Sequence, residues 1–247
     1  MKTRIDILGI PVDAVDYEEA MAIFDGFMKG SRFHFIVTPN SEIIVNATKD
    51  PELKKIIEAA DLVIPDGIGL VYASKILGVP LHERVTGIDF LGKILAYLEK
   101  SGQAIFFLGS KPGIAELAAK RMQGQYPALR VAGVQDGYFK KDQEQSVVER
   151  INNSGADFLC VALGSPKQEE FIYRYRLQLN MKAAIGVGGS LDIWAGVLKR
   201  APEFYRKNGL EWLYRFLQQP SRYKRMAALP LFMLKVLLTK GDSKTAN

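Results

Sequence analysis

The sequence of 247 residues contains few of the side chains that metal and redox sites require. It has one cysteine, Cys160, and two histidines, His34 and His82. A single cysteine cannot form a disulfide within the chain, and Cys160 lies in an apolar run where a buried structural thiol is expected. Because no cluster of Cys and His is present, the sequence does not predict a zinc site.

Three motifs of nucleotide-binding proteins are also missing. No Gly-Lys-Ser or Gly-Lys-Thr follows a glycine-rich turn, so the chain has no Walker loop. Gly186–Leu191 begins like a dinucleotide fingerprint, but leucine replaces its third glycine and it occurs only at the seventh expected strand. No Asp-x-Asp occurs, which argues against the common carboxylate cradle for a metal-bound nucleotide diphosphate. We therefore expect backbone amides and Lys or Arg side chains to hold any diphosphate.

The sequence contains neither a recognisable signal peptide nor an apolar run long enough to span a membrane. The N-terminus reaches Asp6 before any apolar stretch of useful length, so we expect a cytoplasmic protein. The run from Met226 to Thr239 is apolar except for Lys235, but its 14 residues fall short of the roughly 20 that a transmembrane helix needs.

Positive charge is concentrated near the C-terminus. Residues 197–247 contain 11 Lys and Arg but only 3 Asp and Glu, whereas the whole chain has a formal net charge of +6. Aromatic residues are interleaved with these cations, a pattern typical of segments that lie at a membrane surface. In the alternative interpretation, the aromatics pack on the domain and the cations form a solvated face. We do not expect nucleic acid as a partner, because no recognised binding motif accompanies the charge.

The pattern of apolar residues predicts the fold class. Seven short apolar segments alternate with amphipathic helical segments, which is typical of an α/β domain with a mostly parallel, Rossmann-like sheet and helices on both faces. We expect this domain to span residues 1–196 and a basic, aromatic helical appendage to span residues 197–247. The expected strands are residues 5–10, 33–37, 62–64, 104–108, 129–134, 158–163 and 183–187.

Polar and glycine-rich clusters follow directly after the expected strands. Parallel strands end at the same edge of a sheet, where open α/β folds bind their ligands, so we expect these clusters to converge. Turns are polar in every α/β protein, and the pattern alone does not prove a site. The clusters are Thr38 with Asn40, Asp66, Gly109–Gly113, Asp136–Tyr138, Gly164–Gln168 and Gly188–Asp192.

Asp66 is the most prominent carboxylate at this edge, in the turn Pro65-Asp66-Gly67. From the residues alone it is either a ligand-facing group or an ordinary turn and cap residue. Asn40 is similarly either the N-cap of the following helix or a ligand. Arg84, in a polar loop, is either a surface charge or a phosphate clamp.

Over essentially its whole length the chain resembles the WecG/TagA/CpsF glycosyltransferases (glycosyltransferase family 26), and among them the TagA-type members. Each matching motif is short, but together they are specific. They are Thr38-Pro39-Asn40, Pro65-Asp66-Gly67, Arg84-Val85-Thr86-Gly87, Gly133 with Asp136-Gly137-Tyr138-Phe139, Gly164-Ser165-Pro166-Lys167-Gln168-Glu169, Gly186-Val187-Gly188-Gly189, and Arg200-Ala201-Pro202 followed by Gly209-Leu210-Glu211-Trp212.

The resemblance implies a reaction and roles for individual residues. The reaction is metal-independent, inverting transfer of N-acetylmannosamine from its UDP donor to the 4-hydroxyl of N-acetylglucosamine on undecaprenyl diphosphate, for wall teichoic acid synthesis. Asp66 would be the general base. The other implied site residues are Thr38 and Asn40 for positioning, Arg84 and Gln168 for the diphosphate and sugar, Tyr138 and Asp192 for the nucleotide, Asp136, Gly164 and Gly189 as further substrate contacts, and Arg215, Arg222 and Arg225 for lipid head groups or a diphosphate.

The same resemblance implies a peripheral protein on the inner face of the cell membrane, where it would meet a polyprenyl-linked acceptor. The sequence does not visibly encode the choice of donor, so UDP-N-acetylmannosaminuronic acid and UDP-glucose are alternatives. A non-catalytic module that binds a nucleotide sugar or lipid is a second class of interpretation. Apolar helices that flank the sheet could also support a homo-oligomer.

Overall fold

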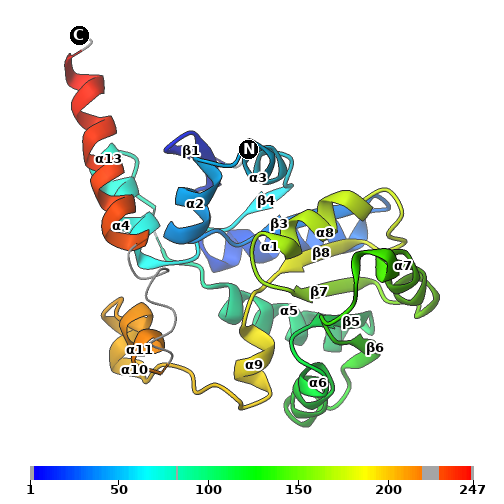
Figure 1. The fold of residues 1–247 in the computed structure, drawn as a ribbon. Helices are drawn as coiled ribbons and strands as arrows, with labels where there is room; N and C mark the ends of the chain where they lie inside the picture. The colour runs from blue at the N-terminus through cyan, green and yellow to red at the C-terminus, as the bar shows by residue number, and fades with distance from the viewer. Residues whose placement is uncertain (1–2, 82, 219–227, 246–247) are drawn as a thin grey trace.

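The computed structural model describes residues 3–81, 83–218 and 228–245. Its main element is a parallel sheet of six strands in the order β4-β3-β8-β7-β5-β6 (Figure 1). Strands β5, β7 and β8 are buried along their whole length, as expected for a parallel sheet covered on both faces. The strands are β3 (His34–Val37), β4 (Leu62–Val63), β5 (Ala104–Gly109), β6 (Arg130–Gln135), β7 (Phe158–Ala162) and β8 (Ala183–Gly186).

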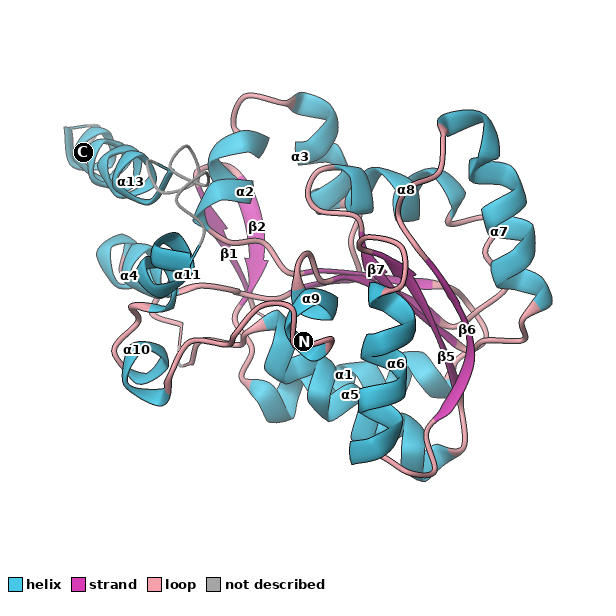
Figure 2. Ribbon diagram, turned by 60° about the horizontal axis from the view of Figure 1, so that its bottom comes forward, coloured by secondary structure: helices cyan, strands magenta, loops and turns pink. Residues whose placement is uncertain are grey.

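Helices cover both faces of this sheet and bury two apolar cores (Figure 2). The core on one face takes residues from α2 (Ser41–Ala47), α3 (Pro51–Glu58), α4 (Ile68–Leu77), α7 (Glu144–Asn153) and α8 (Lys167–Tyr175). The core on the other face takes residues from α1 (Tyr17–Lys29), α5 (Gly87–Ser101), α6 (Ile114–Gln125) and α9 (Ser190–Trp194). The predicted α/β class with helices on both faces is therefore confirmed.

The prediction of one strand over residues 5–10 is wrong. This segment forms an antiparallel hairpin of β1 (Arg4–Ile7) and β2 (Ile10–Asp13), outside the parallel sheet. The chain reverses at Leu8 and Gly9, which both have positive φ, and Asp6 Oδ1 accepts a hydrogen bond of 2.7 Å from the Gly9 nitrogen. Two residues with positive φ are what a tight hairpin turn requires, and the apolar pattern alone concealed this turn.

The central strands β3 and β8 create a place for a ligand. The chain leaves β3 toward β4 at one edge, but it enters β8 from β7 on the other side. The helices that follow these two strands, α2 and α9, contribute to opposite apolar cores. The loops after β3 and β8 therefore diverge to the two faces, and such a divergence opens a crevice at the carboxyl edge of a parallel sheet.

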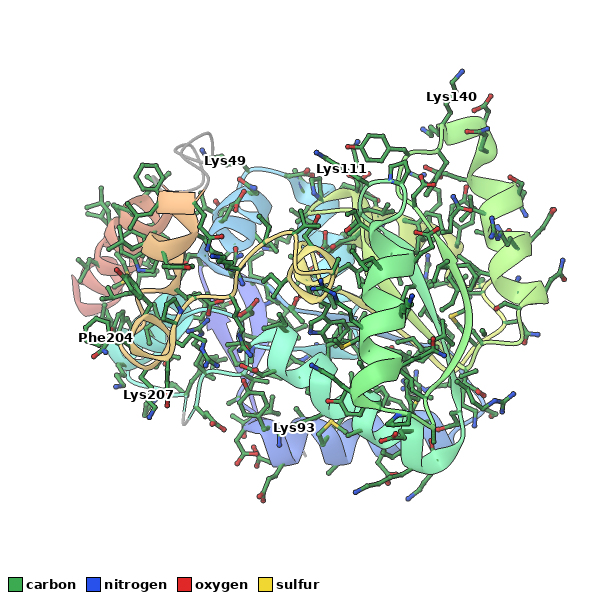
Figure 3. The ribbon with its side chains drawn as sticks, turned by 90° about the horizontal axis from the view of Figure 1, so that it is seen from below. Lys49, Lys93, Lys111, Lys140, Phe204 and Lys207 are labelled. Atoms are coloured by element: carbon green, nitrogen blue, oxygen red, sulfur yellow. The ribbon has the colours of Figure 1, made fainter. Side chains whose placement is uncertain are left out.

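In the last part of the chain, the described residues include the helices α10 (Glu203–Lys207), α11 (Glu211–Gln218) and α13 (Ala228–Thr245), which are gathered at one end of the molecule (Figures 1 and 3). Helix α13 packs against α2 and α4, where the side chains of Phe232 and Val236 are fully buried. Gly69 permits this close approach, because a Cβ there would lie 2.8 Å from a methyl carbon of Leu229. No helix within the described ranges is both long and apolar enough to cross a bilayer.

Candidate active site

A pocket lies at the carboxyl edge of the sheet and is closed by the C-terminal helices. Its walls come from the loops after β3, β4 and β8, from residues 84–88, from α11 and from the first turn of α13. Elements far apart in the sequence thus meet around one cavity, as the divergence of the β3 and β8 loops requires. Of the residues predicted from the sequence, the pocket brings together Asn40, Asp66, Arg84, Gly189 and Arg215.

Backbone hydrogen bonds hold Asp66 at the centre of this edge. Its nitrogen donates to the carbonyl oxygens of Pro39 at 3.1 Å and Ile64 at 2.9 Å, which tie the turn to the loop after β3. Gly67 follows with a φ of 113°, a conformation that favours glycine, and it is the N-cap residue of α4. Asp66 is therefore not the cap residue of the following helix, and its side chain lines the pocket.

The surroundings of Asp66 raise its pKa to about 6. Burial is the largest cause, because it penalises the charged carboxylate. The cations Arg84 and Arg215 and a hydrogen bond from the Gly87 backbone act in the opposite direction, whereas the Glu211 carboxylate raises the pKa further. At neutral pH such a group is mostly ionised yet more basic than an ordinary aspartate, which is suitable for accepting a proton.

A buried ion-pair cluster joins the pocket to the C-terminal helices. Glu211, 5% exposed, accepts a hydrogen bond of 2.7 Å from Arg84 and one of 2.8 Å from Arg215. Sequence reasoning missed Glu211 as a functional residue. Glu211 and Arg215 stand four residues apart, a spacing that places their side chains on the same face of a helix, and this pairing was a readable signal.

Asn40 is the N-cap of α2, one of the two roles expected from the sequence, and it also lines the pocket. Its side-chain oxygen accepts a hydrogen bond of 3.1 Å from the Ile43 nitrogen and so caps α2. With that oxygen engaged, the amide nitrogen is the group that Asn40 can offer to a ligand. Gly189 contributes its loop to the opposite wall.

Thr38 and Gln168 are buried beneath the pocket and are not among its lining residues. Thr38 Oγ1 donates to the Gly186 carbonyl at 2.9 Å, which links β3 to β8. Gln168 Oε1 accepts a hydrogen bond of 2.9 Å from the Gly188 nitrogen, and its Nε2 donates to the buried Glu169 at 2.7 Å. Thr38 therefore ties β3 to the end of β8, and Gln168 holds the loop after β8 in place. The sequence did not distinguish these roles from direct contact with a ligand.

The remaining predicted residues form a second group along the same edge, after β6 and β7 and in α9. Asp192 accepts a hydrogen bond of 3.2 Å from the Ser110 hydroxyl, and Asp136 accepts one of 2.8 Å from the Tyr138 nitrogen. Tyr138 is 70% exposed. Gly164, with a φ of 76°, begins the turn into α8. These residues are not among those lining the pocket around Asp66.

A network that sequence reasoning missed supports the loop carrying Arg84. Thr86 caps α5, and its nitrogen donates to the Tyr17 hydroxyl at 2.9 Å. Thr86 also donates to Asp89 at 2.6 Å, and Asp89 accepts a hydrogen bond of 2.6 Å from Arg200. Because Arg200 precedes α10, this network anchors the start of the C-terminal segment beside the pocket.

Two of the predicted cations, Arg222 and Arg225, lie outside the described residues. Within the part of the chain that is described, no three His, Cys, Asp or Glu side chains gather closely enough to hold a metal ion. The cationic groups found in the pocket are guanidinium groups, which bind phosphate and carboxylate oxygens through paired N–H donors.

Fold and site together define an α/β enzyme whose pocket pairs a basic carboxylate with arginines suited to an anionic ligand. A family model described as the Glycosyl transferase WecG/TagA/CpsF family matches residues 5–246. The chain belongs to the WecG/TagA/CpsF family of glycosyl transferases.

Similar proteins in three bacteria share one name, N-acetylglucosaminyldiphosphoundecaprenol N-acetyl-beta-D-mannosaminyltransferase. The protein of Bacillus spizizenii is 38% identical over 203 residues, which cover 82% of this chain and 78% of that protein. The protein of Bacillus subtilis strain 168 is 35% identical over 210 residues, covering 85% and 81% respectively. The protein of Staphylococcus aureus strain MRSA252 is 35% identical over 246 residues, covering 99% and 96%.

Proposed function

We propose that this enzyme transfers N-acetylmannosamine from UDP-N-acetylmannosamine to the 4-hydroxyl of N-acetylglucosamine on undecaprenyl diphosphate, with inversion, as a step of teichoic acid linkage-unit synthesis. Membership of the family and the shared name of the relatives support this reaction class. The observation that carries the proposal is a single pocket in which Asp66, with its raised pKa, lies beside Arg84 and Arg215.

In the proposed mechanism Asp66 is the general base. The acceptor oxygen attacks the anomeric carbon of the donor, and the bond from that carbon to the UDP oxygen breaks. The hydroxyl proton passes to Asp66, and UDP leaves with the bonding electron pair. Direct displacement requires one base on the side of the acceptor, and the pKa of about 6 makes Asp66 a competent base near neutral pH.

Arg84 and Arg215 would stabilise negative charge on the diphosphate. Charge-assisted N–H···O hydrogen bonds strengthen as the leaving group gains charge, so they favour the transition state over bound substrate. Asn40 would offer its amide nitrogen to the sugar, and Thr38 and Gln168 would act by holding the loops that shape the pocket. The second group along the edge supplies Tyr138 and Asp192 as candidate nucleotide contacts, and Asp136 and Gly164 as further candidate substrate contacts.

The proposed reaction needs no metal ion, because guanidinium groups would neutralise the leaving diphosphate. We expect full turnover in the presence of excess EDTA after the protein has been dialysed against it. The measurement is the rate of UDP release with donor and acceptor present. Loss of activity in EDTA that one added divalent metal restores would contradict this proposal.

The outer face of α13 supports a role at the membrane surface. Phe232 and Val236 face the body of the protein, whereas Leu231, Leu234, Leu237 and Leu238 are between 38% and 61% exposed. Exposed Phe204 and Lys207 lie at the same end of the molecule, on the outer side of α10 (Figure 3). We propose that residues 197–247 hold the enzyme peripherally on the inner face of the membrane that carries its acceptor.

Replacing two of these leucines should weaken membrane binding. We expect the Leu234→Glu/Leu238→Glu variant to bind vesicles containing phosphatidylglycerol at least about tenfold more weakly, because burying each leucine contributes roughly 1.5–3 kcal/mol. Co-sedimentation with vesicles measures this effect. Leu177→Glu is the matched control, since Leu177 is 89% exposed and follows α8, far along the chain from α13. Equal sedimentation of the wild type and the double variant would count against α13 as the contact.

A donor panel tests the proposed reaction. Purified enzyme is given a lipid-linked N-acetylglucosaminyl diphosphate acceptor and, separately, UDP-N-acetylmannosamine, UDP-N-acetylmannosaminuronic acid or UDP-glucose. We expect UDP release and a lipid-linked disaccharide from UDP-N-acetylmannosamine, detected by mass spectrometry. Preference for another donor would assign a different sugar within the family, and binding without UDP release from any donor would indicate a non-catalytic module.

A further inference from the structure

The charged groups of the pocket are paired unevenly. Three carboxylates, Asp66, Glu211 and Glu42, line the cavity together with two arginines, Arg84 and Arg215. Both oxygens of Glu211 are occupied, one by each guanidinium group, at 2.7 Å and 2.8 Å. Among the ion pairs found in the described residues, none joins Asp66 to either arginine within 4.0 Å. Glu211 thus takes both cations and leaves the Asp66 carboxylate without one.

This pairing matters because both arginines are close enough to act on Asp66. The charge of each arginine lowers the pKa of Asp66, and the charge of Asp66 in turn acts to raise the pKa of Arg84. A guanidinium that bound Asp66 directly would occupy its oxygen lone pairs and stabilise the charged form. Asp66 would then be a weaker base, and its oxygens would be less available to a substrate hydroxyl.

We propose that Glu211 is a positioning residue that holds the guanidinium groups of Arg84 and Arg215 away from Asp66, so that the Asp66 carboxylate stays unpaired and free to accept a proton. The inference rests on the proposed role of Asp66 as general base. It assigns a function to a carboxylate of the C-terminal helices, which thereby control the base on the α/β domain as well as contributing cations.

Glu211 suits this role because of its position and burial. It is the first residue of α11, and its side chain is only 6% exposed, so water competes little for its oxygens. Its pKa is lowered despite burial, because Arg215 and Arg84 stabilise its charged form, and it therefore remains an anion while Asp66 titrates. Arg84 reaches it from the loop before α5, whereas Arg215 reaches it from one turn further along α11.

Other groups around Asp66 do not replace Glu211 as a partner for the arginines. The Tyr17 hydroxyl is engaged with Thr86, and its pKa is raised mainly by burial. The Gly87 backbone donates a hydrogen bond to Asp66 and carries no charge. Glu42 also lines the pocket, but within the described residues the ion pairs of Arg84 and Arg215 are both with Glu211. Among the described residues, the charged or titratable groups that line the pocket or act on Asp66 are Tyr17, Glu42, Arg84, Glu211 and Arg215.

The experiment measures the titration of Asp66 directly in full-length protein. Protein labelled with ¹³C at the Asp side-chain carboxyl carbon is titrated by NMR, and the Asp66 signal is assigned by its loss in Asp66→Asn. We expect Asp66 to titrate near pH 6 in the wild type and at least about one pH unit lower in Glu211→Gln, because the negative charge of Glu211 is lost and the arginines, which lose their anion, turn to Asp66. The acidic limb of the pH profile of kcat/KM should move downward in parallel.

A matched control and a second variant separate this effect from local unfolding. Glu203→Gln makes the same chemical change on α10, where Glu203 pairs with Lys207 in solvent, and should leave the titration unchanged. If α11 merely detached in Glu211→Gln, hydration alone would lower the pKa of Asp66. The double variant Glu211→Gln/Arg215→Gln distinguishes the two cases. If α11 remains docked, removal of the Arg215 cation should raise the pKa of Asp66 part of the way back toward its wild-type value. Emission from Trp212, which lines the pocket, reports whether α11 remains docked.

The outcomes are decisive in either direction. A lowered titration in Glu211→Gln, with recovery in the double variant, supports the positioning role. An unchanged titration in Glu211→Gln, or no recovery in the double variant, overturns it. Wild-type turnover in Asp66→Asn would instead overturn the proposed base, whatever the behaviour of Glu211, so the two failures are distinguishable.

Discussion

The Asp66→Asn variant should lose about 10²- to 10⁴-fold in kcat, the usual contribution of a positioned general base. Asparagine is nearly isosteric with aspartate, and the backbone hydrogen bonds that fix the turn do not involve the side chain, so the fold should persist. The amide cannot accept the proton of the acceptor hydroxyl. The initial rate of UDP release at saturating donor and acceptor measures the effect.

Binding of UDP should change little in the same variant, since Asp66 is assigned to the acceptor side. Asp25→Asn is the matched control, because Asp25 is a surface carboxylate on α1 that pairs with Lys29 at 2.6 Å. A folded Asp66→Asn variant with near wild-type turnover would remove Asp66 from the role of base.

The Arg84→Gln variant should bind UDP about ten- to a hundredfold more weakly. A hydrogen bond between charged groups contributes roughly 1.5–3 kcal/mol, and glutamine cannot supply the charge or the paired donors of a guanidinium group. Arg84 is only 18% exposed, so solvent screening does not remove the effect. Isothermal titration calorimetry with UDP measures the change, and KM for the donor should rise with it.

The same substitution leaves Glu211 with one arginine instead of two, so thermal stability must be recorded alongside affinity. Arg84→Lys should recover part of the binding, because it restores a point charge without the fork of donors. Arg32→Gln is the control, since Arg32 pairs with Asp61 at 3.1 Å through a largely exposed side chain. Equal UDP affinity in a folded Arg84→Gln variant would exclude Arg84 from the diphosphate site.

Local sequence patterns predicted most of the sheet because the strands that form it are continuous apolar runs bounded by turns. Helix starts were readable where a cap was present, as at Asp50 before Pro51, where the aspartate accepts hydrogen bonds from Glu52 and Leu53. The hairpin was missed because Leu8 has a φ of 60°. A bulky side chain rarely adopts this conformation, so the residue type does not indicate a turn there.

The site was only partly predictable, since long-range pairing decides it. Asp66 and Arg84 stood out as polar residues at turns, and the structure brings both to the pocket. The pairing of Arg84 with Glu211, 127 positions further along the chain, depends on how α11 docks and has no local signal. Gln168 was predicted as a ligand contact because it lies at a turn after a strand, but its side chain points inward and accepts a hydrogen bond from the Gly188 nitrogen.

The central claim is inverting transfer of N-acetylmannosamine, and the anomeric configuration of the product tests it most directly. Wild-type enzyme is incubated with UDP-N-acetylmannosamine, in which the sugar is α-linked, and a lipid-linked N-acetylglucosaminyl diphosphate acceptor. The disaccharide is then released and its linkage is determined by NMR. The account predicts a β-linked N-acetylmannosamine on the 4-hydroxyl of N-acetylglucosamine. An α-linked product, or no disaccharide while UDP-N-acetylmannosamine is bound, would contradict it.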